Sequence, residues 1–230
     1  MKNDITVFGT CRLKNIARNN KLHEETSYTH CTKEVIQLYK FLNGELTIKD
    51  PYNTLCFRTA FVKKSPIHFK SDLKVRLQQS NAFLIEICSR KKYIHNNNYL
   101  HHLAVDTRFD FYIKTSGYIK NEYVKEIQSD EEIENDIIYI KNMIYPKPLI
   151  FVSHYNSLRD GKLIEDRNSL INLIEHICLK HNIRFVNPTV VLKNYSQHLV
   201  MSEDLGHYTE FGNEKITEYF NHYLEHEIFN

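Results

Sequence analysis

The stretch Ile5-Thr6-Val7-Phe8-Gly9-Thr10-Cys11 decides the fold. Four β-favouring residues predict a short strand, Gly9 permits a tight turn after it, and Cys11 lies at or just beyond that turn. Backbone amides in such a turn favour a thiolate and make the sulfur nucleophilic. Free cysteines are more often small buried apolar residues, so this position predicts a reactive thiol only together with partners elsewhere in the chain.

Four further β-rich runs alternate with segments of helical periodicity. The runs are continuously apolar, which is typical of parallel strands covered by helices on both faces. We therefore predict an α/β fold with a doubly wound, mostly parallel five-stranded sheet flanked by helices. The further strands are expected at Thr54 to Phe57, Ala82 to Ile87, Leu149 to Ser153 and Ile183 to Val186, and the helices at Lys33 to Leu42, 67–79, 130–144, 166–181 and 212–226.

Residues 92–127 interrupt this alternation. They are rich in Tyr, Phe, His and Asn and follow neither period. Because a structureless loop of this length is unusual inside a domain, we expect a small subdomain or a lid, whose aromatic side chains either contact substrate or pack a satellite core. No linker rich in Pro, Gly or Ser divides the chain, so residues 1–230 are expected to form a single domain that includes this insertion.

The composition is that of an ordinary globular protein. Hydrophobic residues make up 42% of the chain and charged residues 25%, and the formal net charge of +2 favours no nucleic-acid partner. Nucleic-acid binding would rest only on Lys63-Lys64, Arg90-Lys91-Lys92 and nearby aromatic residues, which solvated surface charge explains as well. No apolar run approaches the roughly 20 residues that span a bilayer, and no secretion signal is visible. The five cysteines lack a CxxC pair, so a reducing cytoplasm is the expected location.

Motifs for metals and nucleotides are missing from the sequence. His101-His102 are adjacent and should point in different directions on regular structure, and no HExxH spacing occurs among the 13 histidines. No metal site is therefore predicted. Neither GxGxxG nor GxxxxGK[ST] is present, which disfavours dinucleotides and nucleoside triphosphates. No cofactor is expected to be required.

A second chemical motif, Asp204-Leu205-Gly206-His207-Tyr208-Thr209, precedes the last amphipathic segment. An Asp three residues before a His can hold one imidazole nitrogen and leave the other facing a nucleophile. A capping Asp beside a surface His would produce the same spacing. In combination with Cys11, the pair predicts a Cys-His-Asp site.

These two blocks resemble those of the SGNH/GDSL hydrolase superfamily, in which Gly-Asp-Ser follows the first strand and Asp-x-x-His precedes the last helix. The cysteine at position 11 resembles the GSCFA branch and the WcbI-type polysaccharide-biosynthesis proteins. The resemblance implies acyl transfer on a glycan or small ester, with Cys11 as nucleophile, His207 as base and Asp204 orienting it. Water as acceptor would make an esterase or deacetylase, and a sugar hydroxyl would make an O-acyltransferase, for which acyl-CoA is a candidate donor.

The sequence departs from that superfamily in its oxyanion donors, a Gly after the second strand and an Asn after the third. Here Phe57-Arg58-Thr59-Ala60 and Cys88-Ser89-Arg90-Lys91-Lys92 stand at those places. Other preorganised donors can stabilise an oxyanion instead. The alternative is a catalytically inactive SGNH-like module that binds a glycan or a protein. The residues expected to bind the oxyanion or substrate are Gly9, Arg12, Arg58, Ser89, His154 and Asn156, with Arg90 as a further donor and His30 as a further candidate at the rim.

Overall fold

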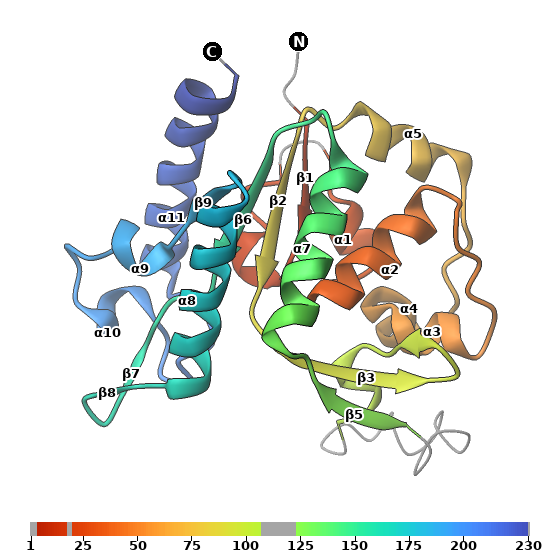
Figure 1. Cartoon of the computed structure of the whole chain (residues 1–230), viewed down its shortest axis with the longest axis horizontal. Coiled ribbons are helices and arrows are strands. Elements are labelled where there is room, and N and C mark those ends of the chain that lie inside the picture. The colour runs from red at the N-terminus through yellow and green to blue at the C-terminus, as the bar shows by residue number, and fades with distance from the viewer. Residues whose placement is uncertain (1–3, 18–19, 107–122, 230) are drawn as a thin grey trace.

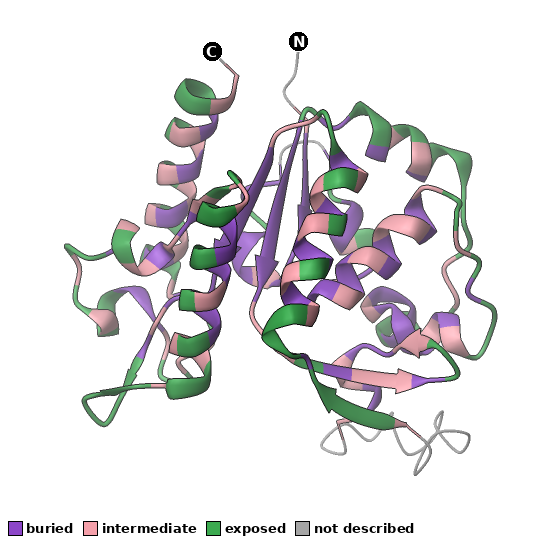
Figure 2. Ribbon diagram, in the orientation of Figure 1, coloured by how far each residue is buried: buried purple, intermediate pink, exposed green. Residues whose placement is uncertain are grey.

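A parallel sheet forms the centre of the molecule in the computed structural model, which describes residues 4–17, 20–106 and 123–229 (Figure 1). All residues of its first three strands are buried, because helices cover both faces of the sheet (Figure 2). The predicted α/β class, with a mostly parallel sheet flanked by helices, is confirmed. The strands lie in the order β1 (Ile5–Phe8), β2 (Ala82–Ile87), β6 (Leu149–Ser153) and β9 (Arg184–Val186).

The predicted strand at Thr54 to Phe57 is wrong. These residues form α3 (Tyr52–Cys56) and lead into α4 (Arg58–Lys63). Leu55, Cys56 and Phe57 are all buried, so the apolar run reflects a short helix in the core, which periodicity alone does not distinguish from a strand. Within the described residues the main sheet therefore has four strands in place of the expected five, and they follow one another in sequence order.

Two clusters of buried side chains lie on opposite faces of the sheet. Alternate strand residues point to alternate faces, so Phe83 and Phe151 belong to one cluster whereas Leu84 and Ile150 belong to the other. The helices of the first cluster are α2 (Thr32–Leu42), α3, α4, α5 (Ser71–Gln79), α7 (Asp130–Ile144) and α8 (Glu165–Lys180). The second contains α10 (Gln197–Val200), α11 (Glu210–Tyr223), the short 3-10 helix η1 (Cys11–Leu13) and the π-helix η3 (Leu224–Ile228).

All five predicted helices are present, with ends that differ from the expected ones by a few residues. α7 spans the expected 130–144, and Ser129 caps it by accepting a hydrogen bond from the Glu132 amide. None of the described helices is both long and apolar enough to cross a membrane. The remaining short elements are α1 (Leu22–Glu25), α9 (Pro188–Val191) and the hairpin of β7 (Leu158–Arg159) with β8 (Lys162–Leu163).

The segment 92–127 contributes to a small antiparallel sheet, which Figure 1 shows beyond the carboxyl end of β2. β3 (Lys91–His95) pairs with β4 (Asn98–Tyr99) and with β5 (Val124–Ile127), and the turn η2 (His102–Ala104) follows β4. Leu100 and Ala104 join the main core, so the part before residue 107 is packed against the body of the protein. The rest of the predicted lid, residues 107–122, lies outside the described residues.

Candidate functional site

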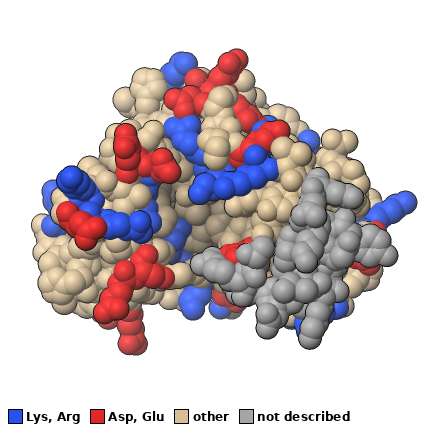
Figure 3. All heavy atoms as spheres, turned by 90° about the horizontal axis from the view of Figure 1, so that it is seen from below, with Lys and Arg blue, Asp and Glu red and all other residues tan. Residues whose placement is uncertain are grey.

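A cavity of about 1060 Å³ lies beyond the carboxyl ends of β1 and β2. Ligands of open parallel α/β sheets bind at this edge. The lining comes from segments that are far apart in the sequence, including the turn after β1, the small sheet with η2, and the loop before α11. Figure 3 views the molecule from this end and shows a hollow bordered by Lys and Arg side chains. Of the predicted site residues, the cavity is lined by Cys11, Arg12, His30, Arg58, Ser89, His154 and His207.

Cys11 is the first residue of η1 and is partly exposed to the cavity. Thr10 fixes this turn to the neighbouring strand, because its backbone N–H and its hydroxyl both donate to Oε2 of Glu86, at 2.9 and 2.6 Å. The thiol therefore directly follows a residue that two hydrogen bonds fix to β2. Its role as a nucleophile stays a prediction.

Asp204 and His207 form a hydrogen-bonded turn ahead of α11. Oδ1 of Asp204 accepts the N–H groups of Gly206 and His207, at 2.8 and 3.1 Å, and Oδ2 lies 2.5 Å from Nδ1 of His207. The hydrogen bond to His207 holds the pKa of Asp204 below its usual value, and the two amides add to this effect. With Nδ1 directed at the carboxylate, Nε2 is left for another partner. Both side chains are more than half exposed, and only His207 lines the cavity.

Glu86 is a residue of this site that sequence reasoning missed. It lies in β2, is 1% exposed, and accepts a hydrogen bond from Nε of Arg12 at 2.7 Å. Burial opposes ionisation of the carboxyl, but the Arg12 charge and the hydrogen bonds outweigh it, so the pKa of Glu86 is lowered. The sequence signal is an acidic residue within the otherwise apolar strand Ala-Phe-Leu-Ile-Glu-Ile, where an unpaired charge would be costly.

Two arginines hold the loop that carries His207. Nη1 of Arg12 donates to the Gly206 carbonyl at 2.5 Å, and Nη1 of Arg167 donates to the Leu205 carbonyl at 2.8 Å. The Leu205 backbone has a φ of 56°, in the left-handed region that is unfavourable for leucine. The two hydrogen bonds therefore stabilise a loop conformation that the local sequence does not favour.

Arg12 is also the residue that connects the thiol turn to the histidine loop. It follows Cys11 directly and reaches a carbonyl 194 positions away. Its guanidinium is buried, and Nη2 has no hydrogen-bond partner among the residues that the structure describes. Arg12 lines the cavity, but this nitrogen is itself shielded from solvent.

Two of the predicted binding residues do not line the cavity. A Cβ on Gly9 would lie 2.8 Å from Cβ of Glu86, so this glycine allows β1 to end close against β2. Nδ2 of Asn156 donates to Asn168 at 2.8 Å, and its backbone N–H donates to Thr189 at 2.7 Å. Asn156 therefore ties the loop after β6 to α8 and α9 instead of facing the cavity.

Among the other predicted donors, Ser89 lines the cavity, but its backbone N–H already donates to the His30 carbonyl at 3.0 Å. Arg58 begins α4, and its guanidinium lies 4.9 Å from the centre of the Tyr28 ring, a cation–π distance. Arg58, one of the predicted binding residues, therefore brings a positive charge to the cavity wall. Arg90 is absent from the lining, and its guanidinium pairs with Asp130.

His154 is a buried residue of the cavity wall. Its Nδ1 lies 2.9 Å from the Tyr155 carbonyl and donates to it. Burial, and then the positive charge of Arg12, lower the pKa of His154 to about 3. The imidazole is therefore neutral at physiological pH.

This neutral imidazole makes stability depend on pH. Between pH 3 and pH 6.5 the unfolded chain binds the His154 proton more tightly, so the free energy of unfolding falls as the pH drops through this window. Between pH 7 and pH 4.5, the free energy of unfolding should fall by about 2–3 kcal/mol less in His154→Gln than in the wild type. Urea unfolding at both pH values measures this difference. The buried His23, whose pKa is lowered to about 4, titrates in both proteins and does not affect the difference between them. An equal fall in the free energy of unfolding in both proteins would contradict the assignment to His154.

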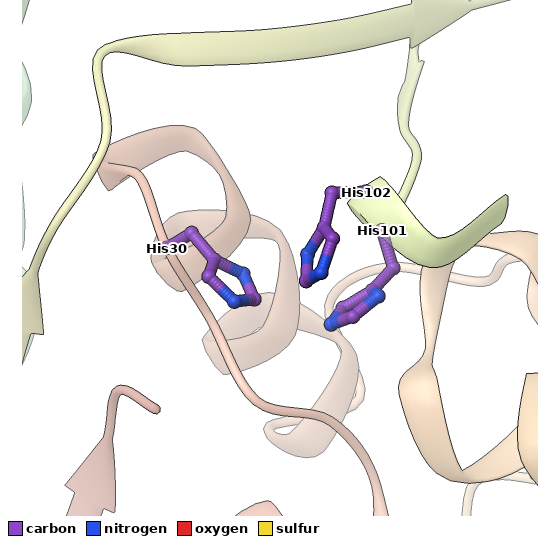
Figure 4. Close-up of side chains that lie close together, drawn as sticks. All are labelled: His30, His101 and His102. Carbon is purple, nitrogen blue, oxygen red and sulfur yellow. The ribbon is translucent and has the colours of Figure 1, made fainter. Parts of the chain in front are cut away.

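Three histidines lie together on another part of the lining, as Figure 4 shows. The ring of His102 is centred 4.3 Å from that of His30 and 4.5 Å from that of His101. The expectation that His101 and His102 point apart is wrong, because the two residues lie at the start of the tight turn η2 and not on a regular strand or helix. Burial, followed by the charges of His30 and His102, places the pKa of His101 well below its ordinary value.

The chain is similar to several known proteins. The model of the TviD N-terminal domain family matches residues 3–123 and 116–221. The Vi polysaccharide biosynthesis protein TviD of Salmonella typhi is 23% identical in an alignment of 283 residues that covers 96% of this chain. The same alignment covers 32% of that relative, so the chain spans about a third of its length.

Several solved structures align with most of the chain at low sequence identity. LAE5, an α/β hydrolase enzyme from the metagenome of Lake Arreo, is 14% identical, with 97% of this chain and 94% of that chain covered and a TM-score of 0.44. Axe2, an acetylxylan esterase from Geobacillus stearothermophilus, is 14% identical, with coverages of 99% and 98% and a TM-score of 0.41. A GDSL-like lipase from Parabacteroides merdae is 12% identical, with coverages of 96% and 95% and a TM-score of 0.41.

Proposed function

Since the chain belongs to the TviD N-terminal domain family, we propose that the cavity is the active site of an acyl-transfer enzyme that acts on a glycan. Cys11 is the nucleophile, His207 the general base and acid, and Asp204 the residue that orients the imidazole. The glycan is inferred from the name of the curated relative, a polysaccharide biosynthesis protein. The cavity, of about 1060 Å³, is large enough for a sugar unit with its acyl group.

One observation carries this proposal. Cys11 and His207, which lie 196 positions apart in the sequence, line the same cavity, and Arg12 joins their two segments through the Gly206 carbonyl. Asp204 already holds Nδ1 of His207, as a catalytic triad requires of its acid. The alternative of a surface His beside a capping Asp does not explain the hydrogen bond that joins the His207 loop to the turn of Cys11.

The chemistry divides into two steps. The Cys11 sulfur attacks the acyl carbonyl, His207 takes the thiol proton, and the bond from the acyl carbon to the leaving group breaks. His207 returns the proton to the leaving group, which departs and leaves a thioester on Cys11. Water or a sugar hydroxyl then attacks the thioester while His207 accepts its proton, and the thiol is regenerated as the acid or the O-acyl glycan leaves. Acyl-CoA is a candidate donor if a sugar hydroxyl is the acceptor.

The oxyanion that forms in each step needs hydrogen-bond donors. The Arg12 guanidinium is our candidate, because Arg12 lines the cavity and carries a buried positive charge. A donor that is already fixed and shielded from water stabilises a developing negative charge without reorganisation. The salt bridge to Glu86 fixes the guanidinium in this way.

Intact-mass spectrometry after exposure to an activated acyl ester, such as p-nitrophenyl acetate, tests the proposal. We expect one acyl group on Cys11 in the wild type and none in Cys11→Ala. Cys88 is the matched control, because it lines the same cavity, but burial raises the pKa of its thiol to about 12. Cys88→Ala should therefore label like the wild type.

An unlabelled Cys11, under conditions that label an established thiol esterase, would contradict catalysis. The protein would then be a binding module. One observation favours this alternative: the Ser89 backbone N–H donates to the His30 carbonyl and is therefore not free to donate to an oxyanion. A binding module should retain its affinity for glycan in Cys11→Ala. If Cys11 of the wild type is not labelled and Cys11→Ala also loses its affinity for glycan, both functions are contradicted.

A further inference from the structure

The three histidines on the cavity wall have the composition of a metal site. His30, His101 and His102 each offer one ring nitrogen, and these three nitrogens all lie within 4.8 Å of one another. The close-up in Figure 4 shows the rings converging from the segment before α2 and from the start of η2. Imidazole nitrogen is the ligand that zinc and the neighbouring divalent transition metals share, at about 2.0–2.1 Å from zinc. A small inward movement of the rings would bring the nitrogens to that distance.

His30 has the supporting contact that metal-binding histidines use. Its Nδ1 lies 3.2 Å from Oε2 of Glu34, and the same oxygen accepts the His30 backbone N–H at 2.8 Å. A carboxylate on one ring nitrogen fixes the tautomer and increases the basicity of the other. Glu34 is 7% exposed and would also bring a negative charge next to a bound dication.

The backbone around the cluster is fixed from several sides. The His30 carbonyl accepts the amides of Cys88 and Ser89, at 3.0 Å each, and the His101 amide donates to the Leu55 carbonyl at 2.9 Å. His101 itself is 1% exposed, and its Nε2 has no hydrogen-bond partner among the described residues. A buried ring nitrogen without a partner costs free energy, which a bound ion would recover.

We propose that His30, His101 and His102 bind a divalent transition-metal ion of the zinc class, with a fourth position open to the cavity. Three protein ligands and one open position are the arrangement of metal sites that take a substrate or water as fourth ligand. All three histidines share the cavity with Cys11. An oxygen atom of the bound substrate would therefore be the fourth ligand.

Metal binding requires a local change at His101. In the structure its Nδ1 accepts the Leu103 backbone N–H at 3.2 Å, so the neutral imidazole carries its proton on Nε2. Ligation through Nε2 moves the proton to Nδ1, and the Leu103 amide must then turn away. This amide should show a large chemical-shift change in the 15N–1H spectrum when the metal binds.

Zinc binding to the whole chain tests the site without an acyl donor, so the result does not depend on Cys11. After incubation with ZnCl2 and gel filtration, we expect about one equivalent of zinc per wild-type chain by elemental analysis. Replacing the Glu34 carboxylate, as in Glu34→Gln, should weaken binding about 10–100-fold in isothermal titration. His30→Gln and His102→Gln should weaken it more. His181→Gln is the control, because His181 pairs with Glu134 rather than with the cluster.

Cobalt provides a second measurement. Co2+ in a tetrahedral site with nitrogen ligands absorbs visible light, and these bands should appear with the wild type and His181→Gln but not with His30→Gln or His102→Gln. Far-UV circular dichroism establishes that each variant is folded. Wild-type zinc content equal to that of folded His30→Gln and His102→Gln would overturn the proposal, as would an unmoved Leu103 amide at saturating zinc.

Discussion

Replacing Cys11 with alanine is expected to lower the rate of acyl transfer at least about 1000-fold, because the proposed covalent intermediate forms on the Cys11 sulfur. The protein should stay folded, since Cys11 is partly exposed and its side chain is small. Steady-state release of p-nitrophenol from an activated ester measures the rate, and the free energy of unfolding in urea establishes that the fold is intact.

Two further variants make this result specific. His207→Ala should cost a similar factor alone and add little in the Cys11→Ala background, because residues that act in one step are not additive. Cys88→Ala should keep the wild-type rate, since the raised pKa of its thiol leaves it unreactive. A rate that depends on Cys88 and not on Cys11 would contradict the assignment of the nucleophile.

The second large effect is on stability. Glu86→Ala is expected to lower the free energy of unfolding by about 3–5 kcal/mol, because it leaves the buried Arg12 guanidinium without its counter-charge. Urea unfolding followed by circular dichroism measures the loss. The double variant Arg12→Met with Glu86→Met removes both charges and should recover much of the stability, since well-packed apolar residues often replace a buried ion pair without loss.

The same double variant separates stability from function. It lacks the hydrogen bond from Arg12 to the Gly206 carbonyl, so the loop of His207 loses its tether to the thiol turn. We expect a folded protein with a much reduced acyl-transfer rate. If the double variant is as unstable as Glu86→Ala, the ion pair is not the origin of the loss. If its rate matches wild type, Arg12 has no positioning role.

The sequence was sufficient for those parts of the fold that depend on local pattern. The runs Ile5 to Phe8, Ala82 to Ile87 and Leu149 to Ser153 are buried on both faces and read as strands, and the five long helices show their periodicity. Thr54 to Phe57 failed because four apolar or β-branched residues fit a buried helix as well as a strand. Only tertiary packing decides between these two conformations.

The site was predictable where two blocks could be compared with a known family, and not where contacts are purely spatial. Cys11 and His207 were singled out from their order along the chain, and both line the cavity. Glu86 has no motif, and its role depends on the position of Arg12 in three dimensions. The histidine cluster combines residues 71 positions apart. It depends on a turn at residues 101–102, which two adjacent histidines in a sequence do not predict.

The hydrogen bond between Arg12 and the Gly206 carbonyl has a consequence for how the protein matures. It joins residues 194 positions apart, and we expect such a contact to form late in folding, because closing a long loop of disordered chain costs entropy. In refolding, helical signal should return first and the proposed acyl-transfer activity last. An assay of the proposed activity would therefore report the completion of folding, which a spectrum of secondary structure does not.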